Sequence, residues 1–412
     1  SLSLSQLTAL SLFPLSSPPS SPSSPPPPPP FSPNNKGELA DRWIAAASLH
    51  PFFRFHHAQG FQEPFRRFAG SGDGSANGDG NGNETETATG EWGPVRDAAR
   101  NSLALRYRLL PALHSAAAQA SATGCPTVRP LWFAWPSLRS AREQAGPYLL
   151  GDSLVVAPAL EPGVTAVEVS LPNSGVSFFD FYSRRRVESG GKSAVSLPAP
   201  RGKPPPLLVV AGGVVAVAGS GGGGKEQVFF NTTSEARAAP LTLIVALPAA
   251  EAEAGAGTGR TKTPTTLRCG RSCKGDGKDL ACGDVYVDKG DELDPGPHKR
   301  GRTLAVDASS SSVRLSWPVP AASKSEGGGE SSSSKCEAGV PWPKLSKIVV
   351  LGAGDFLSSS SSSAVIKARV TSSSNAKTKV DASLDAESGA LELTVAGGGL
   401  QLRCGEDFEV EW

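Results

Sequence analysis

The pattern of apolar and polar residues changes near position 126. Before it, apolar residues recur at spacings of three, four and seven, as on one face of a helix; they are Val95, Ala99, Leu103, Leu110, Leu113 and Ala117. Pro94 suits a first helical position, and Gly124 and Pro126 are expected to end the helix. We therefore predict one long helix over about residues 94–123. An earlier helix-forming stretch begins at Glu38 and is closed by Pro51, and a short aromatic segment that could form a strand follows it.

After Pro126 the chain consists of short β-branched runs, several of them strictly alternating, separated by Gly, Pro and Ser. The clearest runs are VRPLWFAWP, YLLGDSLVVAPAL, TAVEVSLP, LTLIVALP, DVYVDKG, TLAVDAS, SKIVVLG, AVIKARV, LELTV and DFEVEW. Many short strands with turn residues between them are typical of β-sandwiches. The sequence therefore predicts a mainly β fold.

Composition marks the regions outside these elements and excludes two classes of partner. Residues 1–37 are rich in Ser and Pro and are expected to be disordered. The 40 Lys and Arg residues balance 39 Asp and Glu residues, so no long-range electrostatic field favours the binding of nucleic acid. The longest apolar run, Pro206–Gly219, is broken by glycines and is shorter than the roughly 20 residues that span a bilayer. We expect neither nucleic-acid binding nor a membrane span.

Several segments resemble glycoside hydrolase family 31 in order and spacing. They include HPFFRFHH, LALRYRLLP, RPLWFAWP and YLLGDSLVVAPALEPG, and the likeness extends from Glu38 to Trp412. The resemblance implies C-terminal β-sandwich domains preceded by the last βα unit of a (β/α)8 TIM barrel. The expected domains are a disordered segment at 1–37, the end of the barrel at 38–124 with a Gly/Asn-rich insertion at 70–90, a proximal sandwich at 125–224 and a distal sandwich at 225–412.

The same resemblance implies a retaining α-glucosidase that removes terminal α-linked glucose from malto-oligosaccharides or starch-like glucans. Its details favour the acid, lysosomal-type branch over the trimming enzyme of the endoplasmic reticulum. Such enzymes use two carboxylates about 5–5.5 Å apart, a nucleophile and a general acid/base. The family nucleophile lies in a Trp-x-Asp-Met-Asn-Glu segment, and no near variant of it occurs in this chain, which contains no Met.

We therefore expect both catalytic carboxylates to lie upstream of Glu38 and the isolated chain to be inactive. The alternative is a non-catalytic carbohydrate-binding or structural β-sandwich protein.

Two residues of the substrate site are expected within the chain. Arg54 and His56 match the Arg-x-His of the family, in which Arg lies beside the acid/base carboxylate and His bonds a sugar hydroxyl. A guanidinium is permanently charged and donates in a planar fork, and imidazole can donate or accept. Without the resemblance, Arg54 would be interpreted as a surface cation and His56 or His57 as a structural histidine.

Other candidate sites have simpler interpretations. Trp43, Trp132 and Trp135 could stack on a sugar, but core packing is the better prediction. The tract Asp73–Glu84 has nearly the spacing of an EF-hand loop, yet it lies in Gly/Asn/Asp-rich sequence, so no metal or cofactor is predicted. The run Arg184–Arg186 is expected to form an exposed turn between strands, with a basic binding patch as the alternative.

The six cysteines allow 15 pairings, between which the sequence does not choose. They are Cys125, Cys269, Cys273, Cys282, Cys336 and Cys404, and the spacing of the central three favours a disulfide over a zinc site. Asn83 and Asn231 stand in Asn-x-Thr acceptor sequences for glycosylation. Both features favour the secretory pathway, with a vacuolar, lysosomal or extracellular destination.

Overall fold

The structure is a computed structural model, and it describes residues 36–54, 92–172, 175–188, 194–220, 228–249, 269, 273, 279–288, 290, 303–317, 342–357, 367–372, 378–403 and 406–412. The chain divides after Lys36, and Gly37–Trp412 form one compact unit. Its helices are α1 (Lys36–Ala47), α3 (Trp92–Arg108), α4 (Leu110–Thr123), α5 (Leu131–Ala134), α6 (Arg139–Arg142), α7 (Thr233–Ala238) and the 3-10 turn η4 (Ala353–Asp355).

The strands of the first half are β1 (Val128–Pro130), β2 (Tyr148–Leu150), β3 (Leu154–Val156), β4 (Ala166–Ser170), β5 (Phe178–Asp180), β6 (Arg186–Val187), β7 (Ala194–Pro198), β8 (Leu207–Val210) and β9 (Val214–Ala218). Those of the second half are β10 (Leu241–Ala246), β11 (Ala281–Tyr286), β12 (Thr303–Ala308), β13 (Ser312–Ser316), β14 (Lys344–Leu351), β15 (Lys367–Ser372), β16 (Lys379–Leu384), β17 (Leu391–Val395), β18 (Leu400–Gln401) and β19 (Phe408–Glu411). The prediction of a mainly β fold is confirmed.

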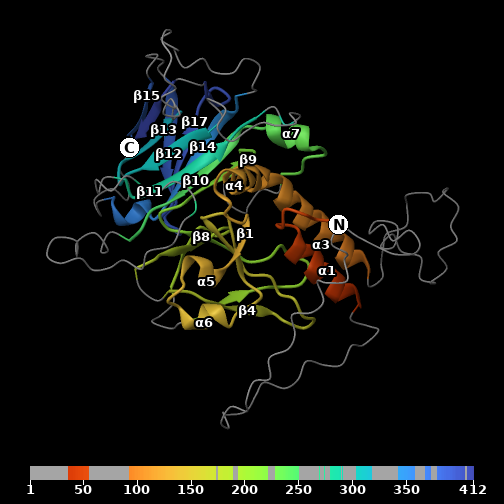
Figure 1. The fold of residues 1–412 in the computed structure, drawn as a ribbon. Coiled ribbons are helices and arrows are strands. Elements are labelled where there is room, and N and C mark those ends of the chain that lie inside the picture. The colour runs from red at the N-terminus through yellow and green to blue at the C-terminus, as the bar shows by residue number, and fades with distance from the viewer. Residues whose placement is uncertain are drawn as a thin grey trace, which may run out of the picture. The chain divides into compact units, whose positions relative to one another are not determined.

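The strands of the described residues form three sheets (Figure 1). A six-stranded sheet has the order β1-β2-β3-β8-β5-β6, and β4 pairs with β7 in a small sheet. The third sheet has eleven strands in the order β11-β12-β13-β19-β15-β16-β17-β14-β10-β9, with β18 paired to β14. Neighbouring strands run antiparallel except β10 and β14, which are parallel. The strand β9 belongs to the large sheet although it follows β8 closely in sequence.

The central strands are buried on both faces, which explains their unbroken apolar sequences. In β8, Leu208 and Val210 pack with β4 and β7, whereas Leu207 and Val209 pack toward β9, β10 and β14. In β10, Ile244 joins that second core, and Leu243 joins a third core inside the large sheet. Alternate residues of one strand thus serve two cores, and the sheets are stacked layers that share these strands.

The large sheet curls until its two ends meet. The strand β11, at one end, contacts β9 at the other, and the amide of Cys282 donates to the carbonyl of Gly212 at 3.1 Å. A Cβ atom on Gly283 would lie 2.8 Å from the Cβ of Val214. Only glycine allows this close approach of the two backbones. The sheet is therefore nearly closed, and its interior holds the largest core of the described residues.

The prediction of one helix over residues 94–123 is wrong, because two helices meet at Leu109. Pro111 lies in the first turn of α4, where its lack of an N–H breaks the hydrogen-bond ladder of a continuous helix. The buried face also differs from the predicted one. Val95, Ala99 and Leu113 are buried as expected, but Leu103 and Leu110 are only half-buried, and Ala117 is exposed while Ala116 is buried instead. The αL residue Gly124 ends α4 as predicted, and its amide donates to the carbonyl of Ala120.

The region after Pro126 also contains short helices that the strand pattern did not predict. The run VRPLWFAWP forms only the three-residue strand β1 before turning into α5, and α6 and α7 lie in other connections. Alternation over so few residues cannot distinguish a strand from one helical turn. No helix in the described part of the chain is long and apolar enough to cross a membrane.

The arginine run after β5 joins the six-stranded sheet to the large sheet. Arg184 pairs with Glu392 on β17, Arg185 with Glu387, and Arg186 with Asp355. Arg184 adopts a left-handed conformation with φ of 63° and is only 8% exposed. The prediction of an exposed turn is therefore wrong for Arg184, because acidic groups from a distant part of the chain cover it.

Glu392 is the centre of this contact, since Lys347 also donates to it, at 3.0 Å. Burial alone would raise the pKa of Glu392, but the hydrogen bonds and charges of Arg184 and Lys347 outweigh it and hold the pKa below its usual range. The carboxylate is therefore stabilised in its ionised form by two cations from different sheets.

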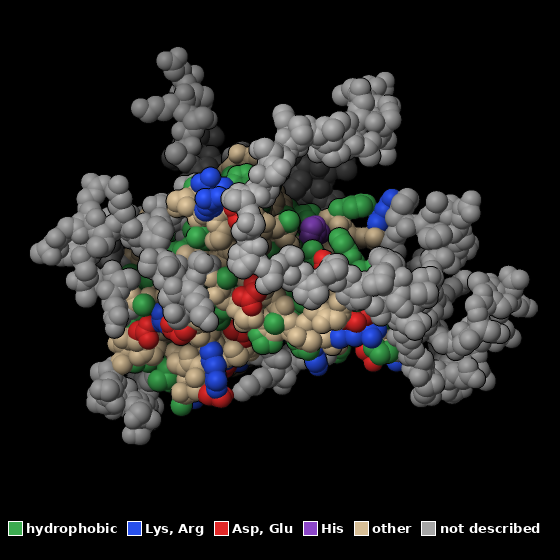
Figure 2. Space-filling model, turned by 90° about the horizontal axis from the view of Figure 1, so that it is seen from below, with side chains coloured by type: hydrophobic (Ala, Val, Ile, Leu, Met, Phe, Trp, Pro, Cys, Tyr) green, Lys and Arg blue, Asp and Glu red, His purple; other side chains and the backbone are tan. Residues whose placement is uncertain are grey.

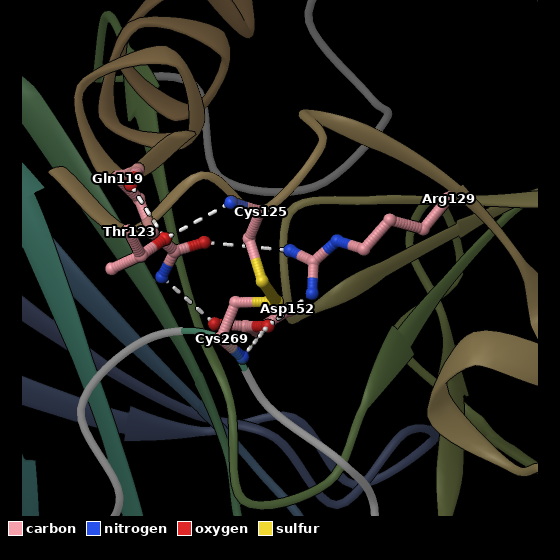
Figure 3. Close-up of a disulfide and its surroundings, with 6 residues drawn as sticks. All are labelled: Gln119, Thr123, Cys125, Arg129, Asp152 and Cys269. Carbon is pink, nitrogen blue, oxygen red and sulfur yellow. Dashed lines mark hydrogen bonds and ion pairs between the residues drawn. A yellow bond between two sulfur atoms is a disulfide. The ribbon is translucent and has the colours of Figure 1, made fainter. Parts of the chain in front are cut away.

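A second polar cluster surrounds the disulfide between Cys125 and Cys269, whose Cα atoms are 6.1 Å apart (Figure 3). The carboxylate of Asp152 accepts from Arg129 at 2.7 Å, from Gln119 at 2.9 Å and from the amide of Cys269 at 3.0 Å. Arg129 is only 1% exposed. Burial opposes the ionisation of Asp152, but these hydrogen bonds outweigh it and lower its pKa.

The described cysteines form two disulfides, Cys125–Cys269 and Cys273–Cys282, which the sequence alone did not choose. They tie Cys269 to the end of α4 and Cys273 to β11. Cys336 and Cys404 lie outside the described residues.

We predict that Glu392→Gln lowers the free energy of unfolding by about 3 kcal/mol, because it leaves two partly buried cations without a countercharge. The matched control is Glu411→Gln on the same sheet, whose partner Arg369 is largely exposed and whose loss should cost at most about 1 kcal/mol. Urea unfolding of both variants measures the difference. Equal unfolding midpoints for the two variants would show that the contact with Arg184 contributes nothing.

We predict that Asp152→Asn also costs about 3 kcal/mol at neutral pH, since Arg129 stays buried without its countercharge. The folded pKa of Asp152 is lowered, so its stabilisation is present above the unfolded value of about 3.9 and is lost as pH falls through the folded value. The stability gap between the natural protein and the variant should therefore shrink below about pH 4. Thermal melts between pH 7 and pH 3 test this. The control is Glu143→Gln, which removes the exposed pair with Arg139. A difference in stability between the natural protein and Asp152→Asn that does not depend on pH would refute the explanation.

Candidate functional site

The segment that follows α1, residues 48–54, carries the first predicted site residue, Arg54. It turns away from the helix because His50 precedes Pro51, which disfavours helical backbone at position 50. Apolar anchoring comes from Leu49, which is fully buried in the core that α3 and α4 share with the six-stranded sheet. The segment beyond Leu49 lies at the surface, and Phe52 is 75% exposed.

Arg106 of α3 fixes the path of this segment. Its guanidinium donates to the carbonyl oxygens of Ser48 and His50, both at 2.6 Å, and lies 5.5 Å from the centre of the Phe53 ring. A planar guanidinium can serve several carbonyl groups at once, which a lysine ammonium does with less directional control. Arg106 therefore satisfies two backbone carbonyl groups of the segment that follows α1.

A second anchor comes from Tyr148 of β2. Its hydroxyl donates to the carbonyl of Ala46 at 3.2 Å, and its ring packs edge-on against His50 at 4.9 Å. Burial raises the pKa of Tyr148, so the phenol stays protonated as a donor. Burial and the charge of Arg106 lower the pKa of His50, which keeps its imidazole neutral at pH 7.

Buried charges hold α1 itself in place. Arg42 donates to the carbonyl oxygens of Ala199 and Val164, at 2.7 and 2.6 Å, and Asp41 accepts from Arg201 at 2.7 Å. Burial raises the pKa of Asp41, although the hydrogen bond and charge of Arg201 act against it. These contacts connect α1 to the loops around β4 and β7, so the start of the segment at Ser48 is fixed from two sides.

Arg54 lies at the end of this anchored segment and is exposed, with its guanidinium carbon 5.3 Å from the centre of the Phe52 ring. A cation at this distance from a ring face is weakly attracted to it. His56 and Asn83 lie outside the described residues, as does the tract Asp73–Glu84. Whether Arg54 and His56 share a substrate site stays a prediction.

Asn231 is exposed immediately before α7. Its backbone amide donates to the side-chain carboxylate of Glu235 at 2.8 Å. The hydroxyl of Thr232 caps the helix by accepting from the backbone amide of Glu235 at 3.1 Å. This reciprocal arrangement resembles a capping box and orders the acceptor sequence at a helix start. The side chain of Thr233, the third residue of the acceptor sequence, is also exposed.

The three tryptophans differ in their surroundings. Trp135 is 2% exposed and packs edge-on against Phe178 at 5.6 Å, as predicted. Trp43 and Trp132 are 54% and 45% exposed, so the prediction of core packing is wrong for both. Their exposure cannot be judged from the sequence, because the surrounding residues read as apolar in each case.

Sequence reasoning missed Arg106 and Tyr148, although both lie in segments that carried the family resemblance. An arginine in a helix and a tyrosine in a strand carry no local sign of a contact with a segment some 50 or 100 residues earlier. The described residues hold no group of three His, Cys, Asp or Glu side chains that could bind a metal. On the face shown in Figure 2, acidic and basic side chains lie beside one another with hydrophobic side chains between them.

Comparison with known proteins matches two parts of the chain to family models. Residues 30–116 match the glycosyl hydrolases family 31 TIM-barrel domain, and residues 124–215 match the glycosyl hydrolase family 31 C-terminal domain.

Curated relatives carry the same family likeness over a limited region. The chain is 32% identical over 170 residues to alpha-xylosidase 1 of Arabidopsis thaliana, which is 41% of this chain and 16% of that protein. It is 32% identical over 156 residues to an alpha-glucosidase of Candida tsukubaensis, 37% of this chain and 12% of that protein. It is 34% identical over 171 residues to a probable alpha-glucosidase of Oryza sativa subsp. japonica, 41% of this chain and 16% of that protein. The chain therefore spans only a small part of the length of these relatives.

Two solved structures share the fold. The glucosidase II alpha subunit, in its DNJ-bound form, aligns with a TM-score of 0.62 at 20% identity over 91% of this chain and 33% of that one. A dextranase of Flavobacterium johnsoniae complexed with glucose aligns with a TM-score of 0.52 at 17% identity, over 92% of this chain and 38% of that one. Residues 30–116 and 124–215 therefore match two consecutive domains of glycoside hydrolase family 31, and these two parts of the chain carry the family likeness.

Proposed function

We propose that the chain is the C-terminal part of a retaining α-glucosidase that releases terminal α-linked glucose from malto-oligosaccharides or starch-like glucans. The single observation that carries the proposal is the anchored segment 48–54, which presents Arg54 within the stretch matched by the barrel model. Curated relatives named alpha-glucosidase support this reaction. The acid, lysosomal-type branch of the family remains our preferred subtype.

We propose that the catalytic carboxylates belong to barrel segments that this sequence does not contain. A family barrel places its reacting groups at the C-terminal ends of several strands, so one βα unit cannot form the pocket alone. Arg54 is proposed to lie beside the acid/base carboxylate and, as a permanent cation, to favour its ionised form. His56 is proposed to bond a hydroxyl of the terminal sugar.

The sandwich domains are proposed to brace the barrel. Tyr148 supports this role, since it reaches from β2 of the proximal sandwich to the carbonyl of Ala46 in α1, while Arg106 of α3 holds the following segment from within the barrel part. A displacement of about 1 Å at a reacting group can lower a rate about a hundredfold, so this bracing acts on the reaction without touching substrate.

We predict that the purified chain does not hydrolyse a chromogenic α-glucoside, whereas the same chain extended upstream by a complete family 31 barrel does so with retention of configuration. In that longer protein, Arg54→Leu should lower kcat/KM by about a hundred- to a thousandfold, the usual effect of removing one oriented charged donor. The matched control is Arg100→Leu, an exposed arginine of α3.

Turnover by the chain alone would refute the placement of the carboxylates. An inert extended protein, or equal effects of the two substitutions, would favour the non-catalytic carbohydrate-binding alternative.

We also propose that the protein enters the secretory pathway, as its disulfides and acceptor sequences suggest. Expressed in a secreting eukaryotic cell, it should carry an N-linked glycan at Asn231. Mass spectrometry of the peptide should show the glycan removed by Asn231→Gln and equally by Thr233→Ala, with Ser234→Ala as the control that retains it. An unmodified Asn231 in secreted protein would contradict the assignment of this acceptor.

A further inference from the structure

A pocket of about 540 Å³ lies between α4, α7 and the strands β10 and β11. This volume falls within the roughly 300–1,000 Å³ of small-molecule sites. Its apolar walls include Leu113, Leu241 and Val285, which are at most 7% exposed. In Figure 1, α4 lies against β9, and its contacts with β11 and α7 bring the walls together.

The polar centre of this pocket is Asp288, two residues beyond the end of β11. It is 5% exposed, and its Oδ2 lies 3.2 Å from Nε2 of His114 on α4. Its other oxygen, Oδ1, is buried and has no hydrogen-bond partner among the described residues. A buried carboxylate oxygen without a donor is costly, which is why such atoms usually have one. The pocket thus holds an acceptor that a ligand could satisfy.

His114 is well placed to serve the same ligand. Its ring packs edge-on against Tyr286 at 5.2 Å and 87°, and its side chain is 42% exposed. Imidazole has a second ring nitrogen that can donate or accept, beside the one directed at Asp288. The pair therefore combines one buried acceptor with one accessible polar ring.

The charge around the pocket favours a neutral ligand. Arg237 and Arg106 line the same pocket as Asp288, and Arg106 is occupied with the backbone of residues 48–51. An anionic ligand would be repelled by the carboxylate of Asp288. A metal ion is not favoured either, because among the described residues Asp288 and His114 have no third His, Cys, Asp or Glu beside them. A ring with hydroxyl groups on its rim and apolar faces matches an acceptor set between apolar walls.

We propose that this pocket binds a terminal sugar ring of a malto-oligosaccharide, with Asp288 accepting a sugar hydroxyl through Oδ1 and His114 contacting a second hydroxyl. The choice of sugar rests on the proposed function, whereas the pocket and its unpaired acceptor do not. Binding here requires no hydrolysis, so it can be measured on the chain as it stands.

The test is isothermal titration of the natural chain with maltotriose, with inorganic phosphate as the anionic probe. The expected result is millimolar binding of maltotriose and none of phosphate. Asp288→Ala should weaken sugar binding about ten- to a hundredfold, the usual loss for a hydrogen bond to a charged group. The matched control is Asp284→Ala on β11, whose exposed side chain lines a different pocket and should leave binding unchanged.

His114→Ala is a second variant in case Asp288→Ala does not fold, because this surface substitution removes the partner and leaves the buried strand intact. It should weaken maltotriose binding about tenfold. Absence of maltotriose binding, equal binding by the Asp288 and Asp284 variants, or phosphate binding at the same pocket would each overturn the proposal. None of these outcomes bears on whether the extended protein hydrolyses α-glucosides, so the two proposals fail separately.

Discussion

Burial of the same strands on both faces is the constraint on which the rest of this structure depends. The strands β3, β8, β10 and β14 each contribute alternate residues to two cores. Burial is worth roughly 25 cal/mol per Å² of apolar surface, so strands apolar on both faces cannot be left at a sheet surface. The layers must therefore stack, and the helices α3 and α4 must cover part of the remaining apolar face.

Stacking places charged groups between layers, and these groups are satisfied in specific ways. Arg184 meets Glu392 across the two sheets, Arg129 meets Asp152 beside a disulfide, and Arg42 uses two backbone carbonyl groups. A buried ion pair contributes little net stability against apolar packing, but a broken one is costly. Such pairs therefore allow one register of the layers and oppose others.

The same layering determines where the functional segment lies. Leu49 is inserted into the core, while Arg106 and Tyr148 hold the backbone on either side of it. The exposed end of the segment, with Arg54, is thereby placed by residues from α3 and β2. The pocket around Asp288 arises similarly, because α4 and β11 meet only when the large sheet closes on itself. Site and pocket are both products of long-range packing.

Local periodicity determined the class of fold, the existence of most strands and the helix end at Gly124, because these follow from patterns a few residues long. The family likeness came from the order and spacing of several segments that resemble family 31. Local periodicity could not place the break at Leu109, where one proline outweighs a continuous apolar face. The partners of Arg184 and Asp152, the disulfide pairing and the unpaired oxygen of Asp288 were decided by tertiary structure alone. Each depends on contacts between residues far apart in the chain, and a sequence pattern carries no information about which distant side chain will lie opposite a charge.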